Sequence, residues 1–456
     1  MDILMSTPLP SGRCVLSARV RDLLRHATLL FIGVCALTPV AKAKQTPLTL
    51  GTAQQVAVLQ SLQVKASDFA VSATTAAAPT AGKLPDPIMT LSIENMPVEG
   101  PDSFRLNRDP MTMQRIGLMQ EFTSRSKRRL RAARAEDTVQ VMTAQRRLAV
   151  AMVKQQTALA WFERHYAEAG QNNLKRQVEA VRLEVAAADS TYRQGQGTAA
   201  NVLAARGLLA QLEDRLAAAD YRVQAAQIAL TRWLGVDADR PLAGAPAIET
   251  LPAHAHDVVN LVTEHPEVQV LDRELLLARA EVELARADRT PDWSVQVMYG
   301  ARDKSFGDMI SVGVSIPLPV NRADRQDRAL ATRLATAAQA EAERDDMRRD
   351  HEARIRTLHE EWQSALKRRD RYRIAVIPLA IDRMTTSLAA YRGGQAPLTE
   401  VLNARRDEAE VQLQALDIEL QAARAWAELS FINPPDDQQI NDVPNTDEPG
   451  AGEITP

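Results

Sequence analysis

Histidine side chains are the first candidates for metal chemistry in this chain, and two pairs have suggestive spacing. His254 and His256 are separated by one residue in a proline-rich linker, a pattern that can hold a metal ion. His351 and His359 lie eight residues apart in a highly charged segment, which puts both on one face of a helix. They lack the four-residue spacing of helical metal pairs. A solvated loop and a solvated helix face are the simpler interpretations, so we assign no metal ligand from the sequence.

Other chemical groups point away from catalysis. Five methionines gather around the first predicted strand pair: Met89, Met96, Met111, Met113 and Met119. Their thioethers could bind Cu(I). Packing in strands and loops is the favoured interpretation. No glycine-rich phosphate loop is recognisable. Both cysteines lie within or before the predicted signal peptide, so thiolate chemistry is lost with it. We expect a protein that is not an enzyme and has no cofactor.

The N-terminus has the pattern of a secretory signal over residues 1–43. An arginine-rich stretch precedes an apolar run from Ala27 to Leu37, and Ala41-Lys42-Ala43 fits a small-x-small cleavage site. Acylation at Cys35 is the alternative, and the bulky Val34 before it disfavours that modification. No later segment is apolar enough for a membrane helix, so a membrane part would have to consist of strands. The net charge of −3 gives no basic field for nucleic acid.

The chain repeats itself with a nearly constant offset of about 200 residues. The segment from Tyr192 to Arg206 resembles that from Tyr391 to Arg405, and Trp161 corresponds to Trp362. Such self-similarity indicates duplication of one structural unit. We divide the chain into a first repeat at 44–235, a linker at 236–255, a second repeat at 256–432 and a disordered acidic tail at 433–456.

Each repeat is predicted to contain a helix, two strands, a very long helix, a tight turn and a returning helix. Alternating apolar residues place the strands at about 88–95 and 114–122, and at about 294–299 and 309–318. Four strands cannot close a sheet in lipid, whereas three copies would supply the strands of one transmembrane β-barrel. The fold class expected is mainly α with a small β part, a long antiparallel α-helical barrel continuing into a β-barrel.

Helix lengths favour this arrangement. The segment from Ser126 to Tyr192 contains no proline, and as a helix it would be about 100 Å long. Two shorter helices, Thr198–Leu234 and Asp257–Asp288, together match that length. The second long helix is expected to begin at Arg322 and to be kinked at Pro378. Narrow apolar seams suit a single-layer wall of helices that is wet on both faces.

These features resemble the TolC family of outer-membrane factors over nearly the whole chain from 48 to 432. The most specific residues are the two turns, Tyr192-Arg193-Gln194-Gly195-Gln196-Gly197-Thr198 and Tyr391-Arg392-Gly393-Gly394-Gln395-Ala396-Pro397. Further segments resemble the heavy-metal branch, whose CzcC-like members serve cobalt-zinc-cadmium or copper-silver systems of the resistance-nodulation-division (RND) type. They are Pro85-Asp86-Pro87, Glu94-Asn95-Met96-Pro97-Val98 and the run from Asp109 to Gly117.

The resemblance implies a function. The protein would be a homotrimer in the outer membrane with a large periplasmic portion, in contact with outer-membrane lipid. It would conduct heavy-metal cations passively from the periplasm to the exterior, together with a periplasmic adaptor and an inner-membrane RND pump. The alternatives are a drug-efflux or type I secretion duct of the same fold, and a soluble periplasmic coiled-coil scaffold or adaptor.

The resemblance also assigns roles at the two turns, which in the family are the periplasmic tips. Adaptor docking is assigned to Tyr192, Gly195, Gly197, Tyr391, Gly393 and Gly394. Selectivity and gating at the entrance fall on Asn201, Glu400 and Asn403, although asparagine stands at two positions where acids are common. Glu400 has two open interpretations: one carboxylate of a cation-attracting ring, or a residue that favours the first turn of its own helix.

Overall fold

The computed structural model describes residues 46–252 and 257–432. The described residues from Leu48 to Ile432 form one compact unit. The predicted signal peptide with both cysteines, the pair His254 and His256, and the acidic tail lie outside the described residues. Within the described part, no helix is long and apolar enough to cross a membrane.

The first repeat begins with two short helices in place of one. Helix α2 covers Leu50–Gln60 and α3 covers Leu62–Ala81, and Ser61 between them caps α3 by accepting a hydrogen bond from the Val64 N–H. Strands β1 (Ile88–Glu94) and β2 (Met113–Phe122) follow. Helix α4 then runs without interruption over 69 residues, from Arg125 to Arg193, and α5 (Ala199–Leu234) returns beside it.

The second repeat has the same order with more interruptions. Helix α6 covers Val258–Thr263 and α7 covers Pro266–Ala287, and strands β3 (Trp293–Ala301) and β4 (Met309–Ser315) follow. The second long helix consists of α8 (Gln326–Arg371), a π-helical turn at Tyr372–Val376 and α9 (Ile377–Arg392). Helix α10 (Leu398–Ser430) returns.

The predictions for two helices are therefore wrong in detail. The expected helix over 257–288 is broken because Pro266, which has no N–H, occupies the first turn of a new helix, α7. The second long helix starts at Gln326, later than expected at Arg322. The expected kink at Pro378 takes the form of the π turn that directly precedes α9.

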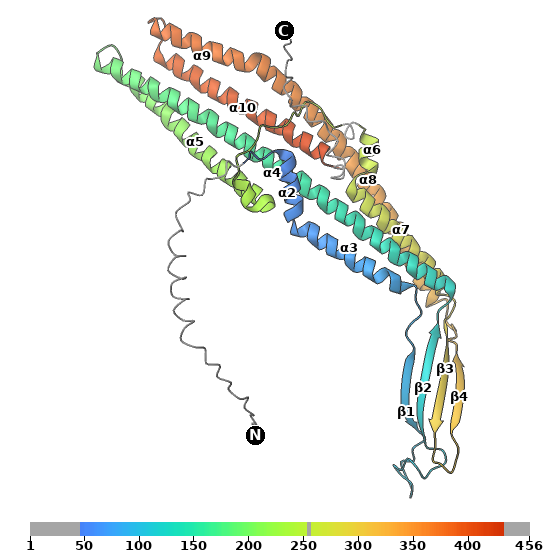
Figure 1. The fold of residues 1–456 in the computed structure, drawn as a ribbon. Coiled ribbons are helices and arrows are strands. Elements are labelled where there is room, and N and C mark those ends of the chain that lie inside the picture. Colours follow the sequence, from blue (N-terminus) through green and yellow to red (C-terminus); the bar gives the residue numbers. More distant parts are fainter. Residues whose placement is uncertain (1–45, 253–256, 433–456) are drawn as a thin grey trace, which may run out of the picture. The chain divides into compact units, whose positions relative to one another are not determined.

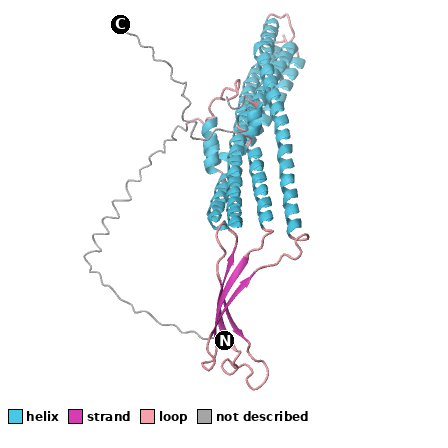
Figure 2. Ribbon diagram, turned by 90° about the vertical axis from the view of Figure 1, so that its right-hand side faces the viewer, coloured by secondary structure: helices cyan, strands magenta, loops and turns pink. Residues whose placement is uncertain are grey.

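The four strands form one antiparallel sheet in the order β1-β2-β3-β4 (Figures 1 and 2). Side chains alternate between the two faces of a strand, so the register defines each face. One face carries two adjacent apolar rows, Met89-Leu118-Val297-Val312 and Leu91-Ile116-Tyr299-Ile310, whose side chains are all exposed. The other face carries the rows Thr90-Gly117-Met298-Ser311 and Ser92-Arg115-Gly300-Met309. The sheet is therefore amphipathic, with its apolar face uncovered.

The helices make a single-layer wall, and α4 is its central member. Toward the turns the contacts follow the order α5, α4, α10, α9, and toward the sheet they follow the order α3, α4, α7, α8. Figure 2 shows the helices lying side by side, with the strands extending from one end. The mainly helical fold class with a small β part is confirmed.

Two apolar cores hold the wall together. The larger core lies where the chain connections cross the middle of the helices, and it includes the fully buried Trp161 and Phe162. The smaller core lies near the turns and includes Val181 and Val401, which are also fully buried. Each core packs side chains from both repeats, so neither repeat buries its apolar surface alone.

Tryptophan residues of the larger core reveal the duplication at the level of single hydrogen bonds. The Trp161 indole N–H donates to the Leu48 carbonyl at 3.2 Å, and the Trp362 indole N–H donates to the Ile248 carbonyl at 2.9 Å. The two donor residues are separated in sequence by about the repeat length, and so are the two acceptor residues. In each repeat, therefore, the long helix is tied to an extended connection by the same indole contact.

We expect Trp161→Phe and Trp362→Phe each to lower the free energy of unfolding by about 1–3 kcal/mol, because each removes a buried hydrogen bond and leaves a void. Trp233→Phe is the matched control, since the Trp233 ring is only half-buried on α5. Thermal unfolding of the detergent-solubilised protein measures the effect. Equal shifts for all three variants would contradict a special role for the two repeated indoles.

Candidate functional site at the two helical turns

The α4–α5 and α9–α10 turns have the same backbone geometry. In the first turn, amides of Gln194, Gly195 and Gln196 donate to carbonyls of Ser190, Tyr192 and Thr191 at 3.1, 3.0 and 3.0 Å. In the second, amides of Gly393, Gly394 and Gln395 donate to carbonyls of Ala389, Tyr391 and Ala390 at 3.0, 3.0 and 2.8 Å. Every bond of one turn has its counterpart in the other, which matches the offset read from the sequence.

Two of the four predicted turn glycines are required by the backbone. Gly195 and Gly394 both have φ of +73°, a left-handed conformation that glycine adopts without strain. Gly393 has an ordinary negative φ, and Gln194 fills the equivalent position in the first turn. Gly197 corresponds to Ala396, so a Cβ is tolerated at that place in one turn. The reversal therefore depends on one glycine in each turn.

The returning helices begin differently. Thr198 caps α5, because its hydroxyl accepts a hydrogen bond from the Asn201 N–H at 3.3 Å. Pro397 occupies the cap of α10 and offers no side-chain acceptor. Glu400 lies in the first turn of α10, where a negative charge is favoured by the helix dipole.

The predicted tip residues differ in exposure. Tyr192 is 49% exposed, whereas Tyr391 packs against the smaller core. Glu400 and Asn403 are exposed, and Asn201 is half-buried. The turns therefore present Glu400 and Asn403 on one returning helix and an accessible tyrosine on the other hairpin.

A buried polar network joins the two hairpins below the turns, and the sequence analysis missed it. Arg405 of α10 donates from Nη2 to Glu184 of α4 and from Nη1 to Glu408, each at 3.0 Å. All three side chains are about nine-tenths buried, with exposures of 12, 11 and 8%. Gln412 continues the network by donating to Glu408 at 3.1 Å and accepting from Asn173 at 2.6 Å.

The network places one guanidinium between two carboxylates that belong to different helices. Because buried charges are tolerated only when paired, the Arg405 charge holds both glutamates in place. The missed signal was the three-residue spacing of Arg405 and Glu408, which puts both on one helix face. Glu184 lies 221 residues from Arg405, so the third member could not be inferred from spacing.

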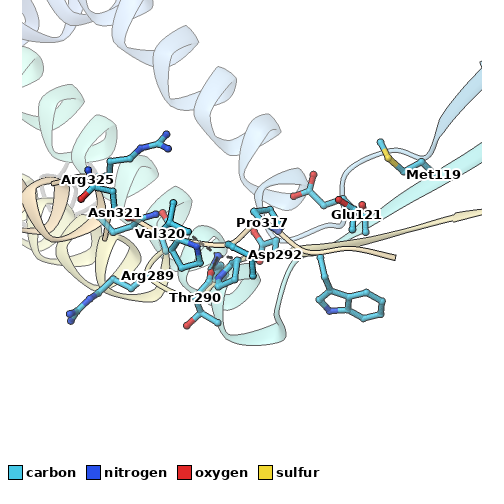
Figure 3. A pocket seen from close by; sticks show the side chains of 18 residues that line it. Met119, Glu121, Arg289, Thr290, Asp292, Pro317, Val320, Asn321 and Arg325 are labelled. Carbon is cyan, nitrogen blue, oxygen red and sulfur yellow. Dashed lines mark hydrogen bonds and ion pairs between the residues drawn. The ribbon is translucent and has the colours of Figure 1, made fainter. Parts of the chain in front are cut away.

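A second polar cluster lies where the helices meet the sheet (Figure 3). A cavity of about 540 Å³ is lined by the connections from α7 to β3 and from β4 to α8, including Thr290, Asp292 and Val320. Lys127 borders it and is only 4% exposed, with Nζ at 3.1 Å from Asp292 Oδ1 and 3.6 Å from Asp288 Oδ1. These ion pairs fix the start of α4 against the start of β3.

Residues 259–432 match the family described as outer membrane efflux protein. The second repeat, which contains these residues, therefore matches this TolC-type family. The match lies within the second repeat, and similarity to solved structures extends over both repeats. A comparison with curated proteins finds no match.

Three solved structures illustrate how far the fold of this chain is shared. CusC, described as forming a transmembrane channel, has a TM-score of 0.65 at 15% identity, covering 84% of this chain and 92% of its own. The outer membrane protein VceC of Vibrio cholerae has a TM-score of 0.66 at 18% identity, covering 83% and 96%. The CmeC outer membrane channel of Campylobacter jejuni has a TM-score of 0.66 at 14% identity, covering 86% and 88%.

Members of the matched family share a general role. Members are the outer-membrane channels of tripartite pumps, with a large periplasmic helical part, and they act as passive channels and not as enzymes. The expected outer-membrane location and the absence of enzymatic activity are therefore confirmed at the level of the family. The cargo and the roles of individual tip residues are specific to each chain.

Proposed function

We propose that this protein is the outer-membrane component of a tripartite efflux pump in which three copies conduct heavy-metal cations from the periplasm to the exterior. The observation that carries the proposal is the amphipathic four-stranded sheet attached to a single-layer wall of long helices. An uncovered apolar face suits lipid, and a helix wall of one layer suits the side of a water-filled duct.

Assembly from three copies follows from the unpaired edges. Strands β1 and β4 are the two ends of the sheet, and an open edge is excluded from lipid because its backbone groups lack partners. Pairing β4 of one protomer with β1 of the next satisfies both edges and closes the sheet. Channels of this family are trimers that work with adaptors and inner-membrane RND pumps, which supports the same number here.

The two turns are the proposed docking surface for the periplasmic adaptor. The surface comprises Tyr192, Gly195, Gly197, Tyr391, Gly393 and Gly394. Its two halves share one backbone geometry, so an adaptor could contact both hairpins in a similar way. The exposed Tyr192 offers this surface an aromatic anchor.

The proposed entrance residues are Asn201, Glu400 and Asn403, which lie just beyond the two turns. Glu400 is exposed near the start of α10, and Asn403 follows it about one helical turn later on the same helix. Asn201 is half-buried near the start of α5, on the other hairpin. Among these three residues, Glu400 alone carries a charge.

Three copies of Glu400 at one level would attract cations to the entrance, because a ring of carboxylates makes the local potential negative. The alternative interpretation of Glu400, that it only favours its own helix dipole, is equally compatible with its position in the first turn of α10. Heavy-metal cargo is further supported by the resemblance of the segments around Pro85-Asp86-Pro87 and Glu94-Asn95-Met96 to that branch of the family.

Growth of a deletion strain tests the cargo. We expect the strain to become sensitive to zinc, cadmium, cobalt or copper while its sensitivity to drugs is unchanged, and to regain resistance when the intact gene is supplied. Glu400→Gln should restore resistance only in part if the carboxylate ring attracts cations, whereas Thr399→Ala, at an exposed neighbour outside the proposed entrance residues, serves as the neutral control. Sensitivity to drugs alone would contradict metal cargo and favour a drug-efflux duct, and loss of a secreted polypeptide would favour type I secretion.

A further inference from the structure

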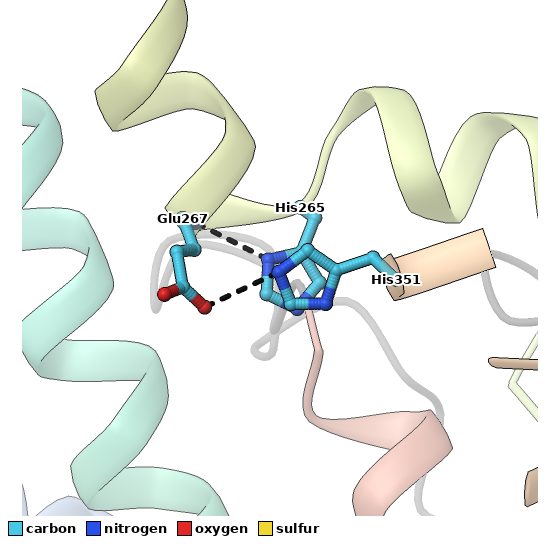
Figure 4. A group of neighbouring side chains, drawn as sticks. All are labelled: His265, Glu267 and His351. Carbon is cyan, nitrogen blue, oxygen red and sulfur yellow. Dashed lines mark hydrogen bonds and ion pairs between the residues drawn. The ribbon is translucent and has the colours of Figure 1, made fainter. Parts of the chain in front are cut away.

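Two histidines that are distant in the sequence meet a glutamate at the start of α7. His265 is the cap residue of α7, Glu267 lies in its first turn, and His351 lies on α8 (Figure 4). The His265 and His351 rings stack with centroids 3.6 Å apart. One ligand atom from each of the three residues lies within 4.8 Å of the others.

The cluster corrects the sequence interpretation of His351. The sequence predicts a solvated helix face there, yet His351 is only 7% exposed because α6 and α7 pack against this part of α8. Its Nε2 lies 3.2 Å from Glu267 Oε2, and among the described residues it has no hydrogen bond of acceptable geometry. A buried ring nitrogen is therefore directed at a carboxylate without a satisfied hydrogen bond, which is unusual for a buried polar atom.

We propose that His265, Glu267 and His351 form a binding site for a divalent transition-metal cation of the zinc class, joining α7 to α8. Two imidazole nitrogens and one carboxylate oxygen are ligands that zinc accepts, with water in the fourth position. Ligand atoms on one tetrahedral zinc ion lie roughly 3.4 Å apart, because the bonds are about 2.0–2.2 Å long. In the structure the three ligand atoms lie within 4.8 Å of one another, so metal binding requires them to move closer together.

Binding requires the two rings to unstack. A metal ion lies near the plane of each imidazole it binds, so stacked rings cannot both direct a nitrogen at one ion. Rotation of His265 would also release its Nδ1 from the Glu267 N–H, to which it is bonded at 3.2 Å. Glu267 is half-exposed, so its carboxylate has room to move.

The surrounding charges are compatible with a cation. Burial, with smaller contributions from His351 and Arg354, lowers the pKa of His265 to about 3, and the Nδ1 lone pair of this ring accepts the hydrogen bond from the Glu267 N–H. Arg354 is a nearby positive charge, and its Nη2 is paired with Glu428 Oε2 at 3.0 Å. The Glu267 carboxylate offsets the charge of the incoming ion. The site does not depend on the cargo proposed above, since it joins two helices of one protomer.

Metal binding is tested on the intact trimer, purified without a histidine tag and freed of metal. We expect titration with Zn²⁺ alone to give one site per protomer and a higher unfolding temperature. Glu267→Gln, the partly exposed ligand, should weaken binding at least about tenfold without preventing assembly. His351→Asn should abolish binding, and Co²⁺ should give the visible absorption of a tetrahedral site in the intact protein only.

Two controls make the result decisive. His359→Asn changes a histidine on the same helix that lies outside the cluster, and it should bind Zn²⁺ like the intact protein. The double variant His254→Asn with His256→Asn tests the linker pair as the rival location. Unchanged Zn²⁺ affinity in Glu267→Gln and His351→Asn, or loss of the site in the linker variant, would overturn the proposal. Metal resistance of the strain is read separately, so failure here leaves the proposed cargo untouched.

Discussion

Val312→Lys is expected to prevent stable assembly in the outer membrane, whereas Ser311→Lys is expected to be tolerated. Val312 is the central residue of β4, is 69% exposed and belongs to the apolar face of the sheet. A lysine on the lipid face costs about 2–4 kcal/mol near the bilayer midplane, and a trimer would carry that cost three times. The measurement is the yield of heat-modifiable trimer in the outer-membrane fraction.

Ser311 makes the control a close one. It is the neighbour of Val312 in sequence, pairs with Met298 and lies on the opposite face, in the same row as Thr90. The two variants therefore add the same charge to the same strand at nearly the same height. Equal loss of trimer in both would show that β4 tolerates no charge at all, and equal tolerance would contradict a lipid-facing apolar face.

Arg405→Ala is expected to destabilise the contact between α4 and α10 by about 3–5 kcal/mol, because removing one partner leaves buried charges uncompensated. Glu184 and Glu408 would then face each other across the two hairpins without their shared guanidinium. We expect the turns to separate more readily. The unfolding temperature of the trimer should fall. The conductance of the trimer, measured in a planar bilayer, should rise.

Arg406→Ala is the matched control for this variant. Arg406 is exposed and its contact with Gln211, at 3.3 Å, lies on the surface, so its removal should change little. Adding Glu184→Gln and Glu408→Gln to Arg405→Ala removes the two uncompensated charges and should recover part of the stability. An unchanged conductance in Arg405→Ala, despite a lower unfolding temperature, would assign the network to stability and not to gating.

Periodicity and duplication made much of the fold predictable. Both ends of every strand lie within about three residues of the positions expected from alternation, because a period of two can be recognised even in short segments. The turn glycines were also legible, because a left-handed backbone favours glycine. Breaks within helices were harder, and Ser61 and His265 cap new helices in segments that have no long interruption of the helical pattern.

The side-chain clusters could not be predicted, because each joins residues that are distant in the chain. His265 and His351 come from separate helices, and Arg405 meets Glu184 across 221 residues. Such contacts depend on the relative rotation of packed helices, which the hydrophobic pattern defines only coarsely. The tryptophan hydrogen bonds were partly foreseeable, since the repeat offset linked the two donors but gave no acceptor.

The π turn at Tyr372–Val376 gives the two hairpins different mechanical properties. Helix α4 is a continuous rod of 69 residues, whereas its counterpart is divided by a turn in which the Ile377 N–H bonds to the Tyr372 carbonyl, five residues back. Pro378 follows at once and lacks a backbone donor, so this is the most compliant joint of the long helix. A force applied at the turns would therefore bend the second hairpin at this point, whereas the first hairpin would stay straight.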